Sequence, residues 1–176
     1  LVDYKPGVFG TTKGLVERFG KDRVRDFPVA ENIMTSSAMG SALVGMRPVV
    51  VHQRLDFMMY SFDPIVNWLS LWRFKSDGKS NLPVTIRTIV GKGWGQGPQH
   101  SQNFQAMFAQ VPGLKVVSPT TPYQAKGLMV AAIEDPDPVI FVEHRWLHGQ
   151  VGDVPENYYS LPIGKAHIIR QGTDLT

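Results

Sequence analysis

The stretch that decides the fold reads AENIMTSSAMGSALVGMRPVVVH and spans residues 30–52. Its first part places apolar residues at helical spacing and stops at Gly45, which predicts a helix from Ala30 to about Val44. Small residues crowd one side of this helix, so another backbone can approach it closely, and we expect a central, buried helix. The β-branched run at 48–52 then predicts a short buried strand.

The same alternation of helix and strand continues along the chain. We expect helices near 15–19, 63–74, 102–110 and 122–133, and strands at 24–27, 84–89, 115–118 and 139–143. Elements that alternate at this spacing predict a three-layer, doubly wound α/β fold with a mainly parallel sheet and right-handed crossovers. Ligands of such sheets bind beyond the carboxyl ends of the strands.

Composition narrows the function classes. The 176 residues suit one domain, and 18 Lys and Arg against 15 Asp and Glu leave a formal net charge of +3. The basic residues are scattered, which argues against nucleic acid as a partner. No cysteine is present, so disulfides, a thiolate nucleophile and Cys-based metal centres are excluded. The longest apolar runs fall far short of the roughly 18 residues of a membrane helix, and we expect a cytoplasmic protein, or a mitochondrial-matrix protein in a eukaryote.

A glycine-rich loop, GKGWGQG at 91–97, follows one of the predicted strands. Its spacing matches neither the dinucleotide-binding nor the P-loop motif, which favours a mobile loop with positive φ angles over a phosphate cradle. His100 comes just after the loop, at the edge where α/β sites form, so a catalytic and a structural role are both open. His144 and His148 stand four residues apart without a third ligand, and we expect both at the surface.

Two further side chains carry candidate chemistry. Glu31 lies in the first turn of the small-residue helix, where a carboxylate complements the helix dipole. If that helix is buried, Glu31 is instead a poorly solvated acid that suits proton exchange with a ligand nitrogen. Phe57, just past the strand that ends at His52, is either a core residue or a flat wall for a heteroaromatic ring. The residues themselves do not decide between the two roles of Glu31 or between the two roles of Phe57.

Taken in order, several blocks resemble the β subunit of the E1 component of 2-oxo acid dehydrogenases and, more distantly, the central pyrimidine-binding domain of transketolases. The blocks extend over nearly the whole chain. They are GVFGTTKGL (7–15), DFPVAE (26–31), GMRP (45–48), FDPIVN (62–67), QHSQ (99–102), PGLKVVSP (112–119) and QAKGL (124–128).

The resemblance implies a thiamine-diphosphate enzyme in which this chain binds the aminopyrimidine half of the coenzyme. Glu31 falls at the family's catalytic glutamate, which hydrogen-bonds the pyrimidine ring so that a proton can leave C2 of the thiazolium. Phe57 falls where the family stacks an aromatic residue on the pyrimidine, and Gln53 lines the same pocket. His100 matches the active-site histidine that handles the substrate, the reactive intermediate or the lipoyl acceptor.

The resemblance also implies partners and metals. A pyrimidine-binding domain is expected at 1–150, with the family's first strand missing, and a linker at 151–176 that leads towards a C-terminal domain. No G-D-G motif with its following Asn is present, so an α subunit or another domain must hold the diphosphate and magnesium, in a heterotetramer or across a homodimer contact. The Trp-rich helix and the glycine-rich loop are candidate contact surfaces. Relatives bind a structural potassium through backbone oxygens, which places such an ion near Ala132, Asp135 and Asp137.

The expected reaction is decarboxylation of a 2-oxo acid and transfer of the acyl group to a lipoyl acceptor, and the fragment alone is expected to be inactive. Arg54 and Leu55 stand where relatives commonly carry aromatic or small residues, so the pocket shape and substrate can differ at this place. Likewise, WLSLW at 68–72 replaces a helix richer in Ala and Lys. The alternatives are transketolase-type ketol transfer from a ketose, a non-catalytic assembly module, and an unrelated doubly wound nucleotide-binding domain.

Overall fold

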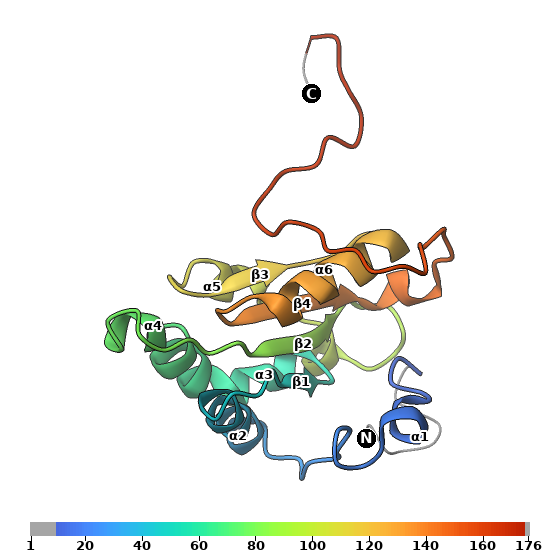
Figure 1. Ribbon diagram of the computed structural model, residues 1–176. Coiled ribbons are helices and arrows are strands. Elements are labelled where there is room, and N and C mark those ends of the chain that lie inside the picture. The colour runs from blue at the N-terminus through green and yellow to red at the C-terminus, as the bar shows by residue number, and fades with distance from the viewer. Residues whose placement is uncertain (1–9, 175–176) are drawn as a thin grey trace.

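A computed structural model describes residues 10–174 (Figure 1). The helices are α1 (Leu15–Phe19), α2 (Glu31–Leu43), α3 (Leu55–Met58), α4 (Trp72–Lys75), α5 (Gln105–Ala109) and α6 (Pro122–Glu134). The strands are β1 (Val49–His52), β2 (Thr85–Val90), β3 (Lys115–Val117) and β4 (Val139–His144). The described residues also contain 3₁₀-helical turns, η1 (Met59–Ser61), η3 (Pro98–His100) and η4 (Arg145–Gly149), and a π-helical turn, η2 (Pro64–Leu69).

The four strands form one parallel sheet in the order β1-β2-β4-β3. Val49 pairs with Thr85, and Val139 pairs with both Thr85 and Lys115, so the strands begin nearly level. Figure 1 shows α6 beside β3 and β4, with α2 and α3 near β1. The predicted doubly wound α/β fold is confirmed. Because every strand runs the same way, all carboxyl ends lie along one edge of the sheet.

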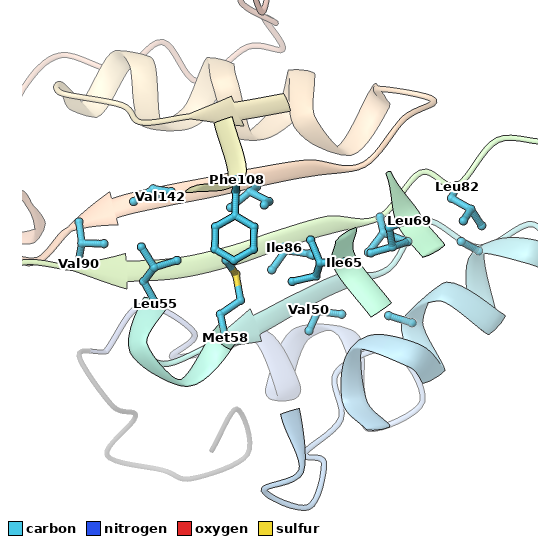
Figure 2. Packing of buried hydrophobic residues seen from close by; sticks show 14 residues of the cluster. Val50, Leu55, Met58, Ile65, Leu69, Leu82, Ile86, Val90, Phe108 and Val142 are labelled. Carbon is cyan, nitrogen blue, oxygen red and sulfur yellow. The ribbon is translucent and has the colours of Figure 1, made fainter. Parts of the chain in front are cut away.

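The core lies on both faces of β2, whose six residues are all buried. On the face that carries α2, α3 and α5, Phe108 is fully buried, and its ring points towards Met58 in Figure 2. On the other face, a smaller cluster joins Val117, Val139 and Phe141 to α6. The sequence of β2, TIRTIV, is not purely apolar, so the buried Thr85 and Arg87 side chains take hydrogen-bonding partners, the Ala132 carbonyl and the Glu143 carboxylate.

Two sequence expectations are wrong. The α2 helix is not buried at the centre: only Thr35, Ala38 and Ala42 are buried, while Ile33 and Leu43 are more than 40% exposed. Ser36, Ser37 and Gly40 are exposed, so among the small residues only Ala38 and Ala42 mark the packed side of the helix. Residues 24–27 form no strand, and within residues 10–174 the sheet has four strands only.

The helix expected over 63–74 is interrupted. It forms a π-helical turn, η2, in which the Ser70 amide donates to Ile65 O (3.1 Å), and α4 follows it. The Ser70 carbonyl meets Gly113 in the loop before β3, where a Cβ would lie only 2.0 Å from that oxygen. Gly113 also has a φ of +89°, so both its conformation and its contact require glycine.

The segment after η4 follows α6 before it leaves the domain. The Leu161 amide donates to Gly127 O (3.1 Å), and the Tyr159 ring stacks on Tyr123 with centroids 4.6 Å apart. Ile163 still packs on the α6 cluster, and the chain beyond it runs away from the sheet in Figure 1. That 151–176 is a linker to another domain stays a prediction.

A buried polar contact fixes α2 to the end of β1. The Thr35 hydroxyl donates to Ser61 Oγ (2.9 Å) and lies 3.0 Å from His52 Nε2. Since the Thr35 proton is directed to Ser61, the His52 Nε2–H is the donor to Thr35. Burial lowers the pKa of His52 to about 4, so the imidazole is neutral in the folded protein near pH 7.

Because His52 is buried and neutral, we expect the folded protein to lose stability in acid. An unfolded histidine has a pKa of about 6.5, so protonation below that pH favours the unfolded chain. The stabilisation is complete above pH 6.5 and is lost as the pH falls towards 4, by about 3 kcal/mol in all. Urea unfolding of the full-length protein between pH 7 and 4.5 measures the slope, and His52→Gln should flatten it. The control, His167→Gln at an exposed histidine, should keep the slope, and an unchanged slope in His52→Gln would contradict the account.

Candidate functional site

The carboxyl edge of the sheet collects the candidate residues. The chain leaves β1 through Gln53 and Arg54 into α3, which carries Phe57. It leaves β2 through the glycine-rich loop into η3, which ends at His100. Because β1 and β2 are neighbours in a parallel pair, these two exits lie side by side.

Phe57 and His100 are brought into contact. Their ring centroids lie 5.1 Å apart and the ring planes are nearly perpendicular, at 86°. The backbone amide of Gln102 donates to Asp56 Oδ1 (3.2 Å), which joins the two segments a second time. Among residues 10–174, neither His100 Nδ1 nor Asp56 Oδ2 has a hydrogen-bond partner, although both atoms are buried. Buried polar atoms are normally satisfied, so this pair of atoms indicates a place that receives a ligand or ordered water.

Glu31 is the first residue of α2 and is half-buried. Its carboxylate accepts no hydrogen bond from the described part of the chain, and no ion pair or ring contact joins it to Phe57 or His100 there. Thr35 lies one helical turn further on, and its contact with His52 ties the helix of Glu31 to the strand that precedes Gln53. Gln53 itself is half-buried.

The sequence marks Arg54 only as a departure from relatives, and the structure shows it as a buried residue of the site with contacts to the glycine-rich loop. Its side chain is almost completely buried, and its guanidinium donates to Gln96 Oε1 and lies 4.9 Å from the Trp94 ring centroid. Burial lowers the pKa of Arg54, Asp56 acts to raise it, and Arg145 lowers it further. The sequence contains a signal for these contacts: Arg54 directly follows a predicted buried strand, and a guanidinium buried there needs hydrogen-bonding partners.

A second polar cluster lies on the α6 face of the sheet. Arg87 in β2 forms a bidentate pair with Glu143 in β4, at 2.8 and 2.6 Å, and His148 Nε2 lies 3.0 Å from Glu143 Oε2. Burial acts to raise the pKa of Glu143, but hydrogen bonds with His148 and Arg87 outweigh it and lower the pKa to about 2. These residues border a hollow of about 290 Å³, which Thr11 and Thr121 also line.

The surface positions expected for His144 and His148 are wrong. Both are half-buried, and the side chain of His148 is only 13% exposed because it packs on Glu143. No group of three or more His, Cys, Asp and Glu side chains in the described ranges is arranged to hold a metal ion.

The residues expected to surround potassium lie at the opposite, amino edge of the sheet. The Ala132 carbonyl accepts from Thr85 Oγ1 (3.0 Å), and the Asp135 carbonyl accepts from the Arg47 guanidinium (3.1 Å). The Asp135 carboxylate pairs with Lys115, and that of Asp137 pairs with Arg73. The potassium site stays a prediction.

A doubly wound domain that places an aromatic ring, a histidine and an acidic helix terminus at the carboxyl edge of its sheet has the form of a coenzyme-binding domain. Residues 2–150 match the family described as transketolase, pyrimidine binding domain. The chain belongs to this family. The alternative of an unrelated nucleotide-binding domain is therefore wrong.

The similar proteins agree with the predicted resemblance. The chain is 45% identical over 170 residues to the acetoin:2,6-dichlorophenolindophenol oxidoreductase subunit beta of Bacillus subtilis, covering 97% of this chain and 50% of that protein. It is 41% identical over 175 residues to the pyruvate dehydrogenase E1 component subunit beta of Porphyra purpurea, covering 99% and 53%. A solved structure described as a split gene transketolase, inactive beta4 tetramer, shares the fold with a TM-score of 0.73 at 20% identity, over 98% of this chain and 52% of that one. The chain thus spans about half the length of the relatives it matches.

Over residues 10–174, no helix combines the length and the apolar character that crossing a bilayer requires.

The ion pair between Arg87 and Glu143 predicts a large cost for removing one partner. Glu143→Gln leaves the buried Arg87 charge without its carboxylate, and we expect a loss of about 3–5 kcal/mol in the free energy of unfolding. Replacing both partners, Arg87→Met with Glu143→Leu, should recover most of that loss because no uncompensated charge remains. Urea unfolding of the full-length protein measures both variants, and a double variant as unstable as Glu143→Gln would contradict this reading.

Proposed function

We propose that this chain is the pyrimidine-binding half of a thiamine-diphosphate-dependent enzyme. In the proposed reaction the complete enzyme decarboxylates a 2-oxo acid and passes the acyl group to a lipoyl acceptor, as E1 assemblies do. The observation that carries the proposal is the perpendicular ring pair of Phe57 and His100, beyond β1 and β2 of the family's fold. Relatives named as β subunits of such dehydrogenases support the reaction class.

The residues present fit the coenzyme. Phe57 is half-buried, and its contact with His100 orients its ring. The Phe57 ring therefore offers a flat apolar surface to a pyrimidine ring. The Glu31 carboxylate is free of hydrogen bonds within the described chain and can accept one from a ring nitrogen. His100 Nδ1 is buried and unpartnered there, so a polar ligand atom can complete it. When bound, thiamine diphosphate supplies an acidic carbon whose conjugate base attacks the 2-oxo group of the substrate.

Each side chain then has a defined task. Glu31 holds a proton at the pyrimidine nitrogen, from the first turn of a helix whose position is fixed by Thr35 and His52. Phe57 orients the ring, and Gln53 borders the same space. His100 donates or accepts a hydrogen bond at the substrate oxygen, and Asp56 holds the backbone next to it through Gln102.

This chain supplies half of the site, and the proposed partner supplies the other half. An α subunit or another domain would hold the diphosphate and its magnesium, because those residues are not found in this sequence. The proposed assembly is a heterotetramer or a complex that uses a homodimer contact, in the cytoplasm or, in a eukaryote, in the mitochondrial matrix. Ketol transfer gains no specific support, since the likeness to the split transketolase shows the fold alone.

Exchanging Glu31 for glutamine tests the proposal in the full-length protein with its partner. Glu31→Gln keeps the shape but removes the acid, so we expect turnover of the 2-oxo acid to fall by about 10²–10⁴-fold while calorimetry still detects coenzyme binding. Glu17→Gln, at an exposed glutamate of α1, is the matched control and should keep full activity. A Glu31→Gln assembly with normal turnover would favour the non-catalytic assembly module instead.

A further inference from the structure

The glycine-rich loop that leads to His100 is held from two sides. Its own backbone offers little rigidity, because Gly91, Gly93, Gly95 and Gly97 all have positive φ angles, between +75° and +120°. Glycine has more backbone conformations available than other residues, so these positions do not by themselves hold the loop in one conformation. A fixed position for His100 therefore requires contacts made by the side chains between these glycines.

The first set of contacts comes from the end of β1. Arg54 donates to Gln96 Oε1, and the same oxygen accepts from Trp94 Nε1 (2.8 Å). The Arg54 guanidinium also lies over the Trp94 ring, at 4.9 Å from its centroid. Arg54, Trp94 and Gln96 thus contact one another in all three pairings. We call these three residues the loop clasp.

The second set of contacts comes from η4, after β4. Trp146 Nε1 donates to the carbonyl of Lys92 (2.8 Å), and the rings of Trp94 and Trp146 lie 5.9 Å apart. The glycines admit these indoles: a Cβ on Gly91 would lie 2.7 Å from Trp94, and one on Gly93 would lie 3.3 Å from Trp146. The loop is therefore packed between the segments that follow β1 and β4.

We propose that Arg54 is a positioning residue that acts through Gln96 and Trp94 to hold the loop closed and to place His100 against Phe57. The catalytic part of this statement rests on the proposed function, because His100 acts on substrate only there.

The chemistry of arginine explains why this position is suited to the task. A planar guanidinium can donate in its plane to Gln96 while its face rests on Trp94, whereas a lysine ammonium cannot make both contacts in one geometry. Burying a guanidinium is costly unless partners surround it. Two of its partners, Trp94 and Gln96, are on the loop, so the loop contacts offset part of the cost of burying the guanidinium.

Hydrogen exchange in the full-length protein with its partner tests the clasp without reference to activity. Gln96→Leu removes the oxygen that accepts from both Arg54 and Trp94, and it leaves the core intact because Gln96 is an exposed loop residue. Arg54→Lys keeps the positive charge but loses the planar guanidinium. We expect amides of residues 92–100 to exchange about tenfold faster in both variants, with β2 unchanged. Lys92→Met, which removes a cation from the same loop without touching the clasp, should exchange as the wild type does.

Steady-state kinetics on the same variants then test the link to His100. We expect kcat for the 2-oxo acid to fall about tenfold in Gln96→Leu and Arg54→Lys, and the double variant to be no worse than either, because both break one unit. Wild-type exchange in the variants would overturn the clasp. Faster exchange with unchanged kcat would overturn the positioning of His100. If the wild-type assembly turns over no 2-oxo acid, the proposed function fails, while the exchange rates still decide the clasp.

Discussion

The parallel pairing of β1 with β2 is the constraint on which the rest of the site depends. It delivers the segments after two strands to the same edge of the sheet, so that Phe57 and His100, which are 43 positions apart in the chain (100 − 57), meet at 5.1 Å. The third participant, Glu31, reaches this edge indirectly. Its helix is fixed by Thr35 to His52, the last residue of β1, so a buried hydrogen bond between neutral groups sets where the acid stands.

The site is therefore made by long-range contacts on a locally ordinary scaffold. Each strand forms from a run rich in β-branched residues. The helices α2 and α6 form where apolar residues recur at helical spacing, and they end where that spacing ends. Two buried arginines then take partners from other elements: Arg54 beside Trp94 and Gln96 at the carboxyl edge, and Arg87 of β2 beside Glu143 on the α6 face. A buried arginine requires partners, and in both places those partners join elements that are distant in sequence.

The fold could be predicted from the sequence and is confirmed, whereas the roles of the candidate residues stay predictions and the arrangement between them needed the structure. The strands and α2 could be predicted because burial imposes a visible apolar pattern. The exposure of α2 could not, since small residues mark close packing and open surface equally well. The interrupted helix lies against Gly113 through Ser70, and His148 packs on Glu143, and periodicity of the sequence indicates neither contact. Arg54 was recognised as a departure from relatives, while its contacts needed the three-dimensional structure.

The central claim is that the coenzyme's pyrimidine ring lies on Phe57 with its nitrogen at Glu31. A crystal structure of the full-length protein assembled with its partner and thiamine diphosphate tests this most directly. The account predicts the ring against the Phe57 side chain and a ring nitrogen within hydrogen-bond distance of the Glu31 carboxylate. A coenzyme ring bound elsewhere, with Glu31 directed into solvent, would contradict it.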